Sequence, residues 1–216
     1  MGTAGKIWLG LIACLLGAAF LWREDAAERE PPSAQAGVAP HSPAARRAQP
    51  PAAVHAYQLP ADLTDPYIVV SKRERRLRLM QNKVCIQNVR IGLGFAPAGH
   101  KERSGDGRTP EGRYYVCVKN TRSKYYLSLG LSYPGKMDAE RGLASGLINR
   151  TQHDQIARAL ERRQSPDWNT KLGGAICIHG HGSGNDWTHG CIALENRDMR
   201  RLFDAIPLQT DVLILP

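Results

Sequence analysis

One glycine-rich stretch near the C-terminus gathers residues whose side chains can carry out covalent chemistry. After an apolar run of strand type it holds three of the chain's seven histidines, His179, His181 and His189, and these are followed by Cys191. A thiol close to an imidazole is the pair from which enzymes make a nucleophile and its general base. Gly190, directly before Cys191, allows a tight bend and brings backbone N–H groups near the sulfur, where they can stabilise an oxyanion.

Two other interpretations of this stretch stay open. The three histidines and Cys191 are also residues that bind zinc, which takes imidazole and thiolate ligands in tetrahedral sites. The stretch can also be a glycine-rich loop whose histidines have no function. Metal analysis of the purified protein distinguishes a zinc site from a thiolate nucleophile.

Two separate blocks of sequence resemble a known family. The first block is Ile-His-Gly at 178–180 followed by Asp-Trp-Thr-His-Gly-Cys-Ile-Ala-Leu at 186–194, and the second is the glycine-rich run 105–114 with Lys101 before it. Together they resemble the signature of the L,D-transpeptidase catalytic domain family, whose members are bacterial and act on peptidoglycan. The resemblance covers residues 66–216 and does not extend to the first sixty residues.

The resemblance implies both a fold and a reaction. The implied fold is mainly β with short helices, a sandwich or barrel of the L,D-transpeptidase type. In the implied reaction, Cys191 attacks a carbonyl of a peptidoglycan stem peptide and forms a thioester, and the acyl group then passes to an amine. His179 matches the family's base, whose reference pKa of ~6.5 suits proton transfer from a thiol, and His189 is the alternative base.

The remaining expected site residues surround this pair. We expect the amides of Gly190 and Cys191 to stabilise the oxyanion, and the carbonyl of Gly180 to orient the imidazole. The residues expected to contact substrate are Thr188, Lys101, Gly180 and Tyr126. Neither a metal ion nor a cofactor is expected.

Two features differ from many members of the family. The residue two positions after the cysteine, where many members have Arg or Asn, is Ala193. The gap between His179 and Cys191 is also shorter than in the best-known members. Both features resemble a branch with an Asp-Trp-Thr-x-Gly-Cys-Ile-Ala pattern, which includes hydrolases of peptidoglycan-linked peptides. A hydrolase of the same fold, an L,D-carboxypeptidase or an amidase or endopeptidase that releases peptide or lipoprotein, is therefore the alternative. A zinc-binding or non-catalytic wall-binding module is the second alternative.

Length and charge restrict the class of protein. The chain has 216 residues, which suits one domain with extensions, and a formal net charge of +9. A basic balance favours binding to anionic lipid or anionic cell-wall polymer. No recognised nucleic-acid motif is present, so nucleic acid is not an expected partner. The sequence does not predict the oligomeric state.

The N-terminal third differs from the rest in composition. Residues 1–22 contain an uncharged apolar run after Lys6, which favours an inner-membrane anchor over a cleaved signal sequence or a lipoprotein site at Cys14. Residues 23–65 are rich in Pro and Ala and predict an extended linker. The catalytic domain, 66–216, would then lie on the periplasmic side of the inner membrane, or in the periplasm after cleavage.

Residue patterns predict the elements of that domain. Alternating and β-branched residues predict strands at 67–70, 77–80, 84–91, 114–118, 125–131, 173–178 and 211–215, the first three as an antiparallel meander. Helix-forming residues predict a helical part within 138–163 and a short helix at 196–203. Three further cysteines, Cys85, Cys117 and Cys177, fall in predicted strands, where a disulfide between two of them stays open.

Overall fold

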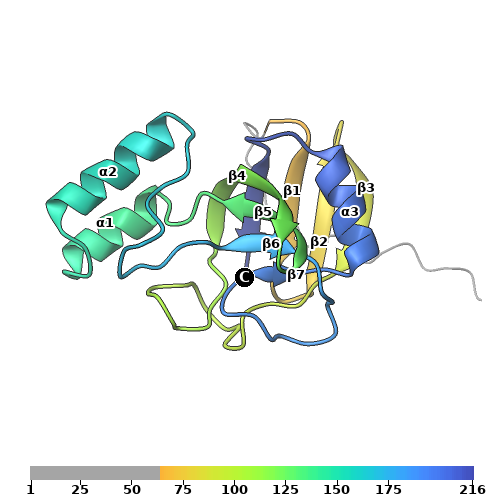
Figure 1. Cartoon of the computed structure of the whole chain (residues 1–216), viewed down its shortest axis with the longest axis horizontal. Helices are drawn as coiled ribbons and strands as arrows, with labels where there is room; N and C mark the ends of the chain where they lie inside the picture. Colours follow the sequence, from red (N-terminus) through yellow and green to blue (C-terminus); the bar gives the residue numbers. More distant parts are fainter. Residues whose placement is uncertain (1–63) are drawn as a thin grey trace, which may run out of the picture. The chain divides into compact units, whose positions relative to one another are not determined.

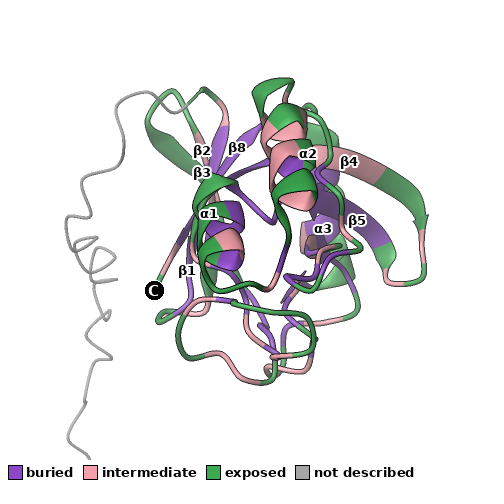
Figure 2. Ribbon diagram, turned by 90° about the vertical axis from the view of Figure 1, so that its left-hand side faces the viewer, coloured by how far each residue is buried: buried purple, intermediate pink, exposed green. Residues whose placement is uncertain are grey.

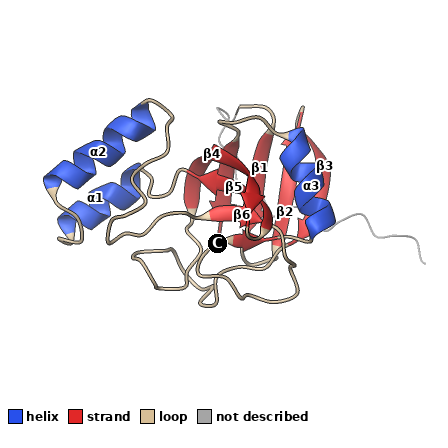
Figure 3. Ribbon diagram, in the orientation of Figure 1, coloured by secondary structure: helices blue, strands red, loops and turns tan. Residues whose placement is uncertain are grey.

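The computed structural model describes residues 64–216, so the expected membrane segment and nearly all of the expected linker lie outside the described residues. This part of the chain consists of strands and short helices joined by loops (Figure 3). Their bounds are β1 Tyr67–Ser71, β2 Arg76–Gln81, β3 Val84–Arg90, β4 Gly112–Ser123, β5 Tyr126–Leu131, α1 Lys136–Ala144, α2 Arg150–Glu161, β6 Cys177–His179, β7 Ile192–Ala193, α3 Asn196–Ala205 and β8 Asp211–Leu215. Between residues 64 and 216, none of the helices has the length and apolar character needed to cross a membrane.

The strands form one curved sheet of eight strands in the order β3-β2-β1-β8-β4-β5-β6-β7 (Figure 1). The predicted antiparallel meander of the first three strands is confirmed, since β1 pairs with β2 and β2 with β3 in antiparallel register. The C-terminal strand β8 lies parallel to β1, between β1 and β4. The predicted mainly β fold with short helices is therefore correct, in the form of a half-barrel rather than two stacked sheets.

Strand β4 gives the sheet its curvature. Residues 112–115 of β4 pair with β8, and residues from Val116 onward pair with β5. The register of the second pairing shifts between Val116 and Val118. A bulge of this kind bends a strand and increases its twist. Beyond β3, Gly92 forms a bridge with Ala193 of β7, which connects the two ends of the strand order. The curvature thus brings the last strands of the sheet against the loop that follows β3.

The main apolar core lies between the curved sheet and α3. Figure 2 shows the buried residues of these elements in purple. Helix α3 contributes Met199, Leu202 and Phe203, which recur at i, i+3 and i+4 and so lie on one face of the helix. The sheet contributes buried side chains such as Leu129 and Ile178, whose exposed fractions are zero. Because β6 is inside this core, the residues at its end are held rigidly.

The predicted helical part 138–163 is two helices rather than one. Gly146, with φ of +72°, ends α1, and Asn149 begins α2 by accepting a hydrogen bond from the amide of Gln152. The two helices stand to one side of the sheet (Figure 1) and share a small apolar cluster with Leu172. This hairpin connects β5 to the segment that leads into β6.

Candidate active site

The strands β6 and β7 bring the expected nucleophile and base together. They pair in parallel, with Ile178 opposite Ile192 and His179 opposite Ala193. His179 is therefore the last residue of β6, and Cys191 directly precedes β7 on the neighbouring strand. One position earlier in the same register, Cys177 lies beside Cys191.

His179 is held in one orientation by the backbone. Its side chain is 2% exposed, and its Nδ1 lies 2.7 Å from the carbonyl oxygen of Gly180. A carbonyl oxygen only accepts hydrogen bonds, so Nδ1 must bear the proton and donate it there. The remaining nitrogen, Nε2, is left to interact with Cys191, which is a hydrogen-bond partner of this imidazole. The arrangement suits a base that accepts the thiol proton.

Two aromatic side chains enclose the imidazole. Tyr125 stacks on His179, with ring centroids 4.5 Å apart and an interplanar angle of 23°. Trp187 meets the imidazole edge-on at 5.5 Å, and its indole N–H donates to the carbonyl oxygen of Gly182. Neither residue is among those expected from the sequence to form the site. Trp187 lies within the quoted motif, but no sequence signal distinguishes Tyr125 from its neighbour Tyr126.

The electrostatics of Cys191 favour the thiolate. A hydrogen bond from the Cys177 thiol, followed by one from His179, holds the pKa of Cys191 well below its ordinary value, against the opposing effect of burial. The backbone N–H of Cys177 also points at this sulfur, with a distance of 3.4 Å from nitrogen to sulfur. A lowered thiol pKa near a histidine is typical of a reactive cysteine.

The turn before Cys191 depends on Gly190 and Thr188. Gly190 has φ of +125°, and a Cβ added to it would lie 2.6 Å from the carbonyl oxygen of Arg108. The Thr188 hydroxyl accepts from the amide of Gly190 at 3.1 Å and donates to the carbonyl oxygen of Cys191 at 2.8 Å. Thr188, which is 3% exposed, therefore shapes the turn. Two predictions for this turn need a correction as a result.

The first correction concerns the expected oxyanion donors. The amide of Gly190 donates to Thr188 and is not free, which leaves the Cys191 amide as the candidate of the two. The second concerns Thr188 itself, because its hydroxyl is used within the turn instead of facing a substrate. Both corrections have one physical cause: a tight turn satisfies its own polar groups before it can offer them to a ligand.

The loop between His179 and Cys191 is fastened to the sheet by charge. Asp186 forms an ion pair with Arg75, 2.8 Å apart, and also accepts the backbone N–H of Leu93 at 2.9 Å. Glu195 accepts two hydrogen bonds from Ser183, one from its amide and one from its hydroxyl. Contacts of Ser183 and of Asp186 thus hold the loop in place, although it contains several glycines.

The other two histidines of the motif are exposed and contact aromatic rings. His189 is exposed, and its ring meets Phe95 edge-on at 5.5 Å. His181 is also exposed and lies edge-on to Tyr125 at 5.8 Å. Within residues 64–216 no three His, Cys, Asp or Glu side chains are grouped so that they could hold a metal ion. The zinc interpretation therefore has no ligand set in this part of the chain.

Lys101 was expected to contact substrate, and the structure gives it a different role. Its side chain is 3% exposed and donates to Asp106 at 2.8 Å and to the carbonyl oxygen of Arg103 at 2.9 Å. Burial acts to raise the pKa of Asp106, but hydrogen bonds from Lys101 and from three backbone amides lower it to about 2. Lys101 therefore holds the loop 101–108 in place, because its buried ammonium group donates its hydrogen bonds to residues of that loop.

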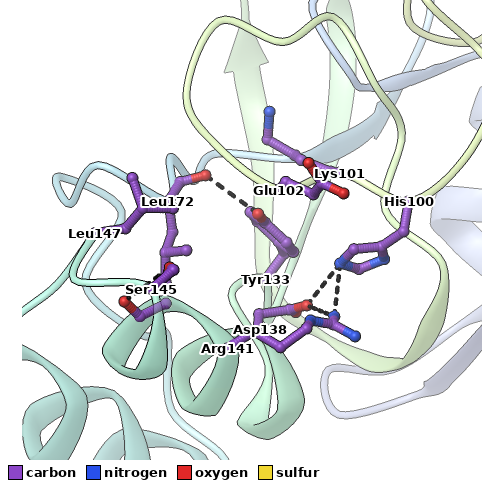
Figure 4. Close-up of a pocket in the computed structure, with 10 residues that line it drawn as sticks. His100, Lys101, Glu102, Tyr133, Asp138, Arg141, Ser145, Leu147 and Leu172 are labelled. Atoms are coloured by element: carbon purple, nitrogen blue, oxygen red, sulfur yellow. Dashed lines mark hydrogen bonds and ion pairs between the residues drawn. The ribbon is translucent and has the colours of Figure 1, made fainter.

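Lys101 also lines a cavity of about 220 Å³ between this loop and α1 (Figure 4). On its opposite wall, His100 and Arg141 both reach Asp138, at 2.8 and 2.6 Å. Neither Cys191 nor His179 lines this cavity. Lys101 and Glu102 pair with charges outside the cavity, Asp106 and Arg108, so that each charged group in the lining already has a partner.

Gly180 and Tyr126 lie close to each other at the rim of the site. A Cβ on Gly180 would lie 2.4 Å from Oδ1 of Asn196 and 3.1 Å from Cβ of Tyr126. Tyr126 is 37% exposed, and its hydroxyl accepts a hydrogen bond from Arg200 at 3.3 Å. Gly180 thus acts on His179 through the Gly180 carbonyl. Tyr126 presents an exposed ring beside Gly180.

The thiols that were expected to allow a disulfide are not bonded to one another. Cys85, Cys117, Cys177 and Cys191 are all free. Cys85 is exposed on the edge strand β3, whereas Cys117 is partly buried on β4. Of the other three, Cys177 is the one that contacts the sulfur of Cys191.

Comparison with protein families gives one match. The family model of the L,D-transpeptidase catalytic domain matches residues 65–214, which is most of the chain. The match includes both blocks of sequence that resemble the family, and it includes Cys191 and His179. No curated protein matches the chain.

Solved structures give several similarities of fold. The chain is 23% identical to the helical cell shape determining protein Pgp2 (K307A mutant) from Campylobacter jejuni, covering 71% of this chain and 47% of that one with a TM-score of 0.49. It is 15% identical to the L,D-transpeptidase from Xylanimonas cellulosilytica, covering 72% of this chain and 62% of that one with a TM-score of 0.42. The chain thus spans about half to three fifths of the length of these proteins.

Proposed function

The chain belongs to the L,D-transpeptidase catalytic domain family, and we propose that it is a peptidoglycan-modifying cysteine acyltransferase. The observation that supports this most is the pairing of Cys191 with an imidazole whose other nitrogen is fixed by Gly180. A thiolate held beside an oriented base is what acyl transfer through a thioester requires. Peptidoglycan stem peptides are the proposed substrates, and cell-wall biogenesis is the proposed process.

In the first half of the proposed reaction, the Cys191 sulfur attacks a carbonyl carbon of a stem peptide. The proton of the thiol goes to Nε2 of His179. The tetrahedral intermediate carries its negative charge on oxygen, and the amide of Cys191 is the proposed donor to it. When the C–N bond breaks, the leaving amine takes the proton from His179, and the acyl group remains on Cys191 as a thioester.

In the second half, a second amine attacks the thioester carbon. His179 removes the proton of this amine and returns it to the Cys191 sulfur when the C–S bond breaks. The product is a new amide, which joins two peptides. Tyr125 and Trp187 support these steps because they keep water away from the imidazole and restrict its rotation.

The location of the enzyme is part of the proposal. An apolar segment at 1–22 and a Pro/Ala-rich segment at 23–65 would place the domain on the periplasmic side of the inner membrane at the end of a tether. The net charge of +9 supports this, since both the membrane surface and cell-wall polymers are anionic.

Product analysis tests the reaction. The full-length chain is incubated with muropeptides, with and without an added amine acceptor, beside the Cys191→Ala variant. Cys85→Ala is the matched control, because Cys85 is an exposed thiol on the edge strand. We expect a product joined to the acceptor in the wild type and in the control, and none with Cys191→Ala.

Two other outcomes have defined meanings. A shorter product that forms regardless of the acceptor, and that requires Cys191, would replace transfer with hydrolysis. No product in any tube would contradict an enzymatic role and favour a wall-binding module.

A further inference from the structure

A second thiol lies beside the nucleophile, and the proposed reaction gives it no chemical step. The parallel register of β6 and β7 pairs Ile178 with Ile192, and its extension by one residue puts Cys177 opposite Cys191. Paired positions on neighbouring strands place their side chains on the same face of a sheet. The two sulfurs therefore face the same side of the sheet.

Contacts of the sulfurs agree with the register. Sγ of Cys177 lies 3.4 Å from the carbonyl oxygen of Ala175, and Sγ of Cys191 lies 3.7 Å from the same oxygen. The two thiols are also hydrogen-bond partners of each other. Neighbouring strands are about 4.8 Å apart, which falls within the range of Cα separations that a disulfide spans, roughly 4.4 to 6.8 Å.

The two thiols differ in character. The hydrogen bond to Cys191 and burial raise the pKa of Cys177, whereas the pKa of Cys191 is lowered. Cys191 is thus the thiolate, which oxidants attack, and Cys177 is the protonated neighbour. Both side chains are partly exposed, so that a small oxidant or reductant can reach them.

We propose that Cys177 is a resolving cysteine, which forms a reversible disulfide with Cys191 when a hydroperoxide oxidises the site. This goes beyond the proposed function and depends on the placement of the sulfurs, whatever acceptor the enzyme uses. While the disulfide exists, the nucleophile is unavailable. The disulfide also prevents Cys191 from reaching the irreversible sulfinic and sulfonic acids.

The oxidation proceeds in two steps. The Cys191 thiolate attacks one oxygen of hydrogen peroxide, the O–O bond breaks, and the departing hydroxide takes a proton from the His179 imidazolium and leaves as water. Cys191 is then a sulfenic acid. The Cys177 sulfur attacks the Cys191 sulfur, the S–O bond breaks, and the hydroxyl leaves as a second water with the Cys177 proton. Sulfur is oxidised, and the peroxide is reduced.

The sequence makes this disulfide simple to detect. No Lys or Arg lies between Lys171 and Arg197, so trypsin leaves both cysteines in one peptide, 172–197. A disulfide within this peptide removes two hydrogen atoms and blocks alkylation at both cysteines. The readout is a mass and does not require turnover of any substrate.

The experiment treats the reduced full-length chain with hydrogen peroxide, alkylates it with N-ethylmaleimide and digests it without reduction. We expect the wild-type peptide 172–197 to lose both alkyl groups and to regain both when dithiothreitol precedes alkylation. Cys177→Ser should instead accumulate sulfinic and sulfonic acid at Cys191, which dithiothreitol does not reverse. Cys85→Ser removes an exposed thiol on the edge strand β3 and leaves both cysteines of the peptide in place, so this variant should behave as the wild type does.

Two results from the wild-type chain alone would overturn the proposal. One is a peptide 172–197 with an alkylated Cys177 beside an over-oxidised Cys191. The other is a peptide in which both cysteines are still alkylated after peroxide has oxidised Cys85. Because both are read from the wild type, they hold even if Cys177→Ser fails to fold.

Discussion

Nδ1 of His179 lies 2.7 Å from the carbonyl oxygen of Gly180, the next residue in the chain. This contact fixes the tautomer of the imidazole, because the carbonyl must receive the proton of Nδ1. The other nitrogen is then free to take a proton from Cys191. A bend of one residue at the end of β6 thus orients the general base without the help of a carboxylate.

His179→Gln should abolish most activity. Glutamine has no ionisable nitrogen, so it cannot accept the thiol proton, and removal of a general base lowers the rate by about 10²- to 10⁴-fold. Steady-state kcat/KM with muropeptides measures the loss. His153→Gln is the matched control, since His153 lies on α2 with Asp154 as its partner. If His189→Gln lost activity while His179→Gln kept it, the base would be His189 instead.

The pH dependence of alkylation should separate Cys191 from other cysteines. The pKa of Cys191 is lowered, so its thiolate persists to a lower pH, whereas burial raises the pKa of Cys117. The alkylation rate with iodoacetamide follows the thiolate fraction. We expect alkylation of Cys191 to persist to a lower pH than alkylation of Cys117, as measured by peptide mass spectrometry. Alkylation rates that rise over the same pH range for the two cysteines would contradict the lowered pKa of Cys191.

Gly190→Ala should destabilise the protein more than a nearby glycine replacement does. Gly190 has a positive φ, and an added Cβ would collide with the carbonyl of Arg108. Strain of this kind costs about 1 to 3 kcal/mol. Gly184→Ala, in the same loop, meets open space and should change the free energy of unfolding by less than about 0.5 kcal/mol. Equal urea midpoints for the two variants would show that the turn is not constrained as described.

The acid stability of the protein should depend on Asp106. Its pKa is about 2 in the folded chain, against 3.8 ordinarily. A carboxyl with a lowered folded pKa stabilises the folded state above its unfolded pKa, and this contribution disappears as the pH falls through the folded pKa, a change of about 1 to 2 kcal/mol. Asp106→Asn should therefore be less stable than the wild type at pH 6 and should lose less stability between pH 5 and 2.

Urea unfolding at a series of pH values measures this difference. Glu140→Gln, which changes an exposed carboxyl on α1, is the control and should keep the wild-type pH dependence. An Asp106→Asn curve parallel to that of the wild type would indicate that the pair with Lys101 does not contribute in this way.

Much of the sheet was predictable from residue patterns, because strands with one buried face alternate in a way that the sequence records. The strand at 77–80 is an example, since its buried residues, Leu77 and Leu79, are the ones the alternation marks. The strand at 211–215 is instead a short apolar run, and it is buried almost throughout. The strand expected at 173–178 is wrong at its start. Gly173 and Ala175 both have positive φ, so that β6 contains only Cys177–His179. Nothing in an apolar run containing alanine indicates a positive φ.

The sequence predicted the site residues that are recognisable by their type and their spacing in the motif. It did not predict the contacts that depend on how distant segments pack together. Cys191 and His179 are recognisable by type, and the structure brings them together. The stacking of Tyr125 rather than Tyr126 on His179 depends on the turn between β4 and β5, where Tyr126 has φ of +75°. Burial of Lys101 depends on Asp106, a partner that the sequence does not distinguish from other acidic residues. The adjacency of Cys177 and Cys191 depends on the register between β6 and β7, which are joined by a loop of twelve residues, 180–191.

A thioester between Cys191 and a stem peptide is the intermediate of the proposed reaction, and mass spectrometry of the intact protein detects it. The full-length chain is mixed with muropeptides in the absence of an amine acceptor, quenched in acid within seconds and analysed by mass spectrometry with peptide mapping. We expect an added acyl mass on peptide 172–197 at Cys191, absent from Cys191→Ala and removed by hydroxylamine. An unmodified Cys191 during ongoing product formation, or an acyl group on another residue, would contradict it.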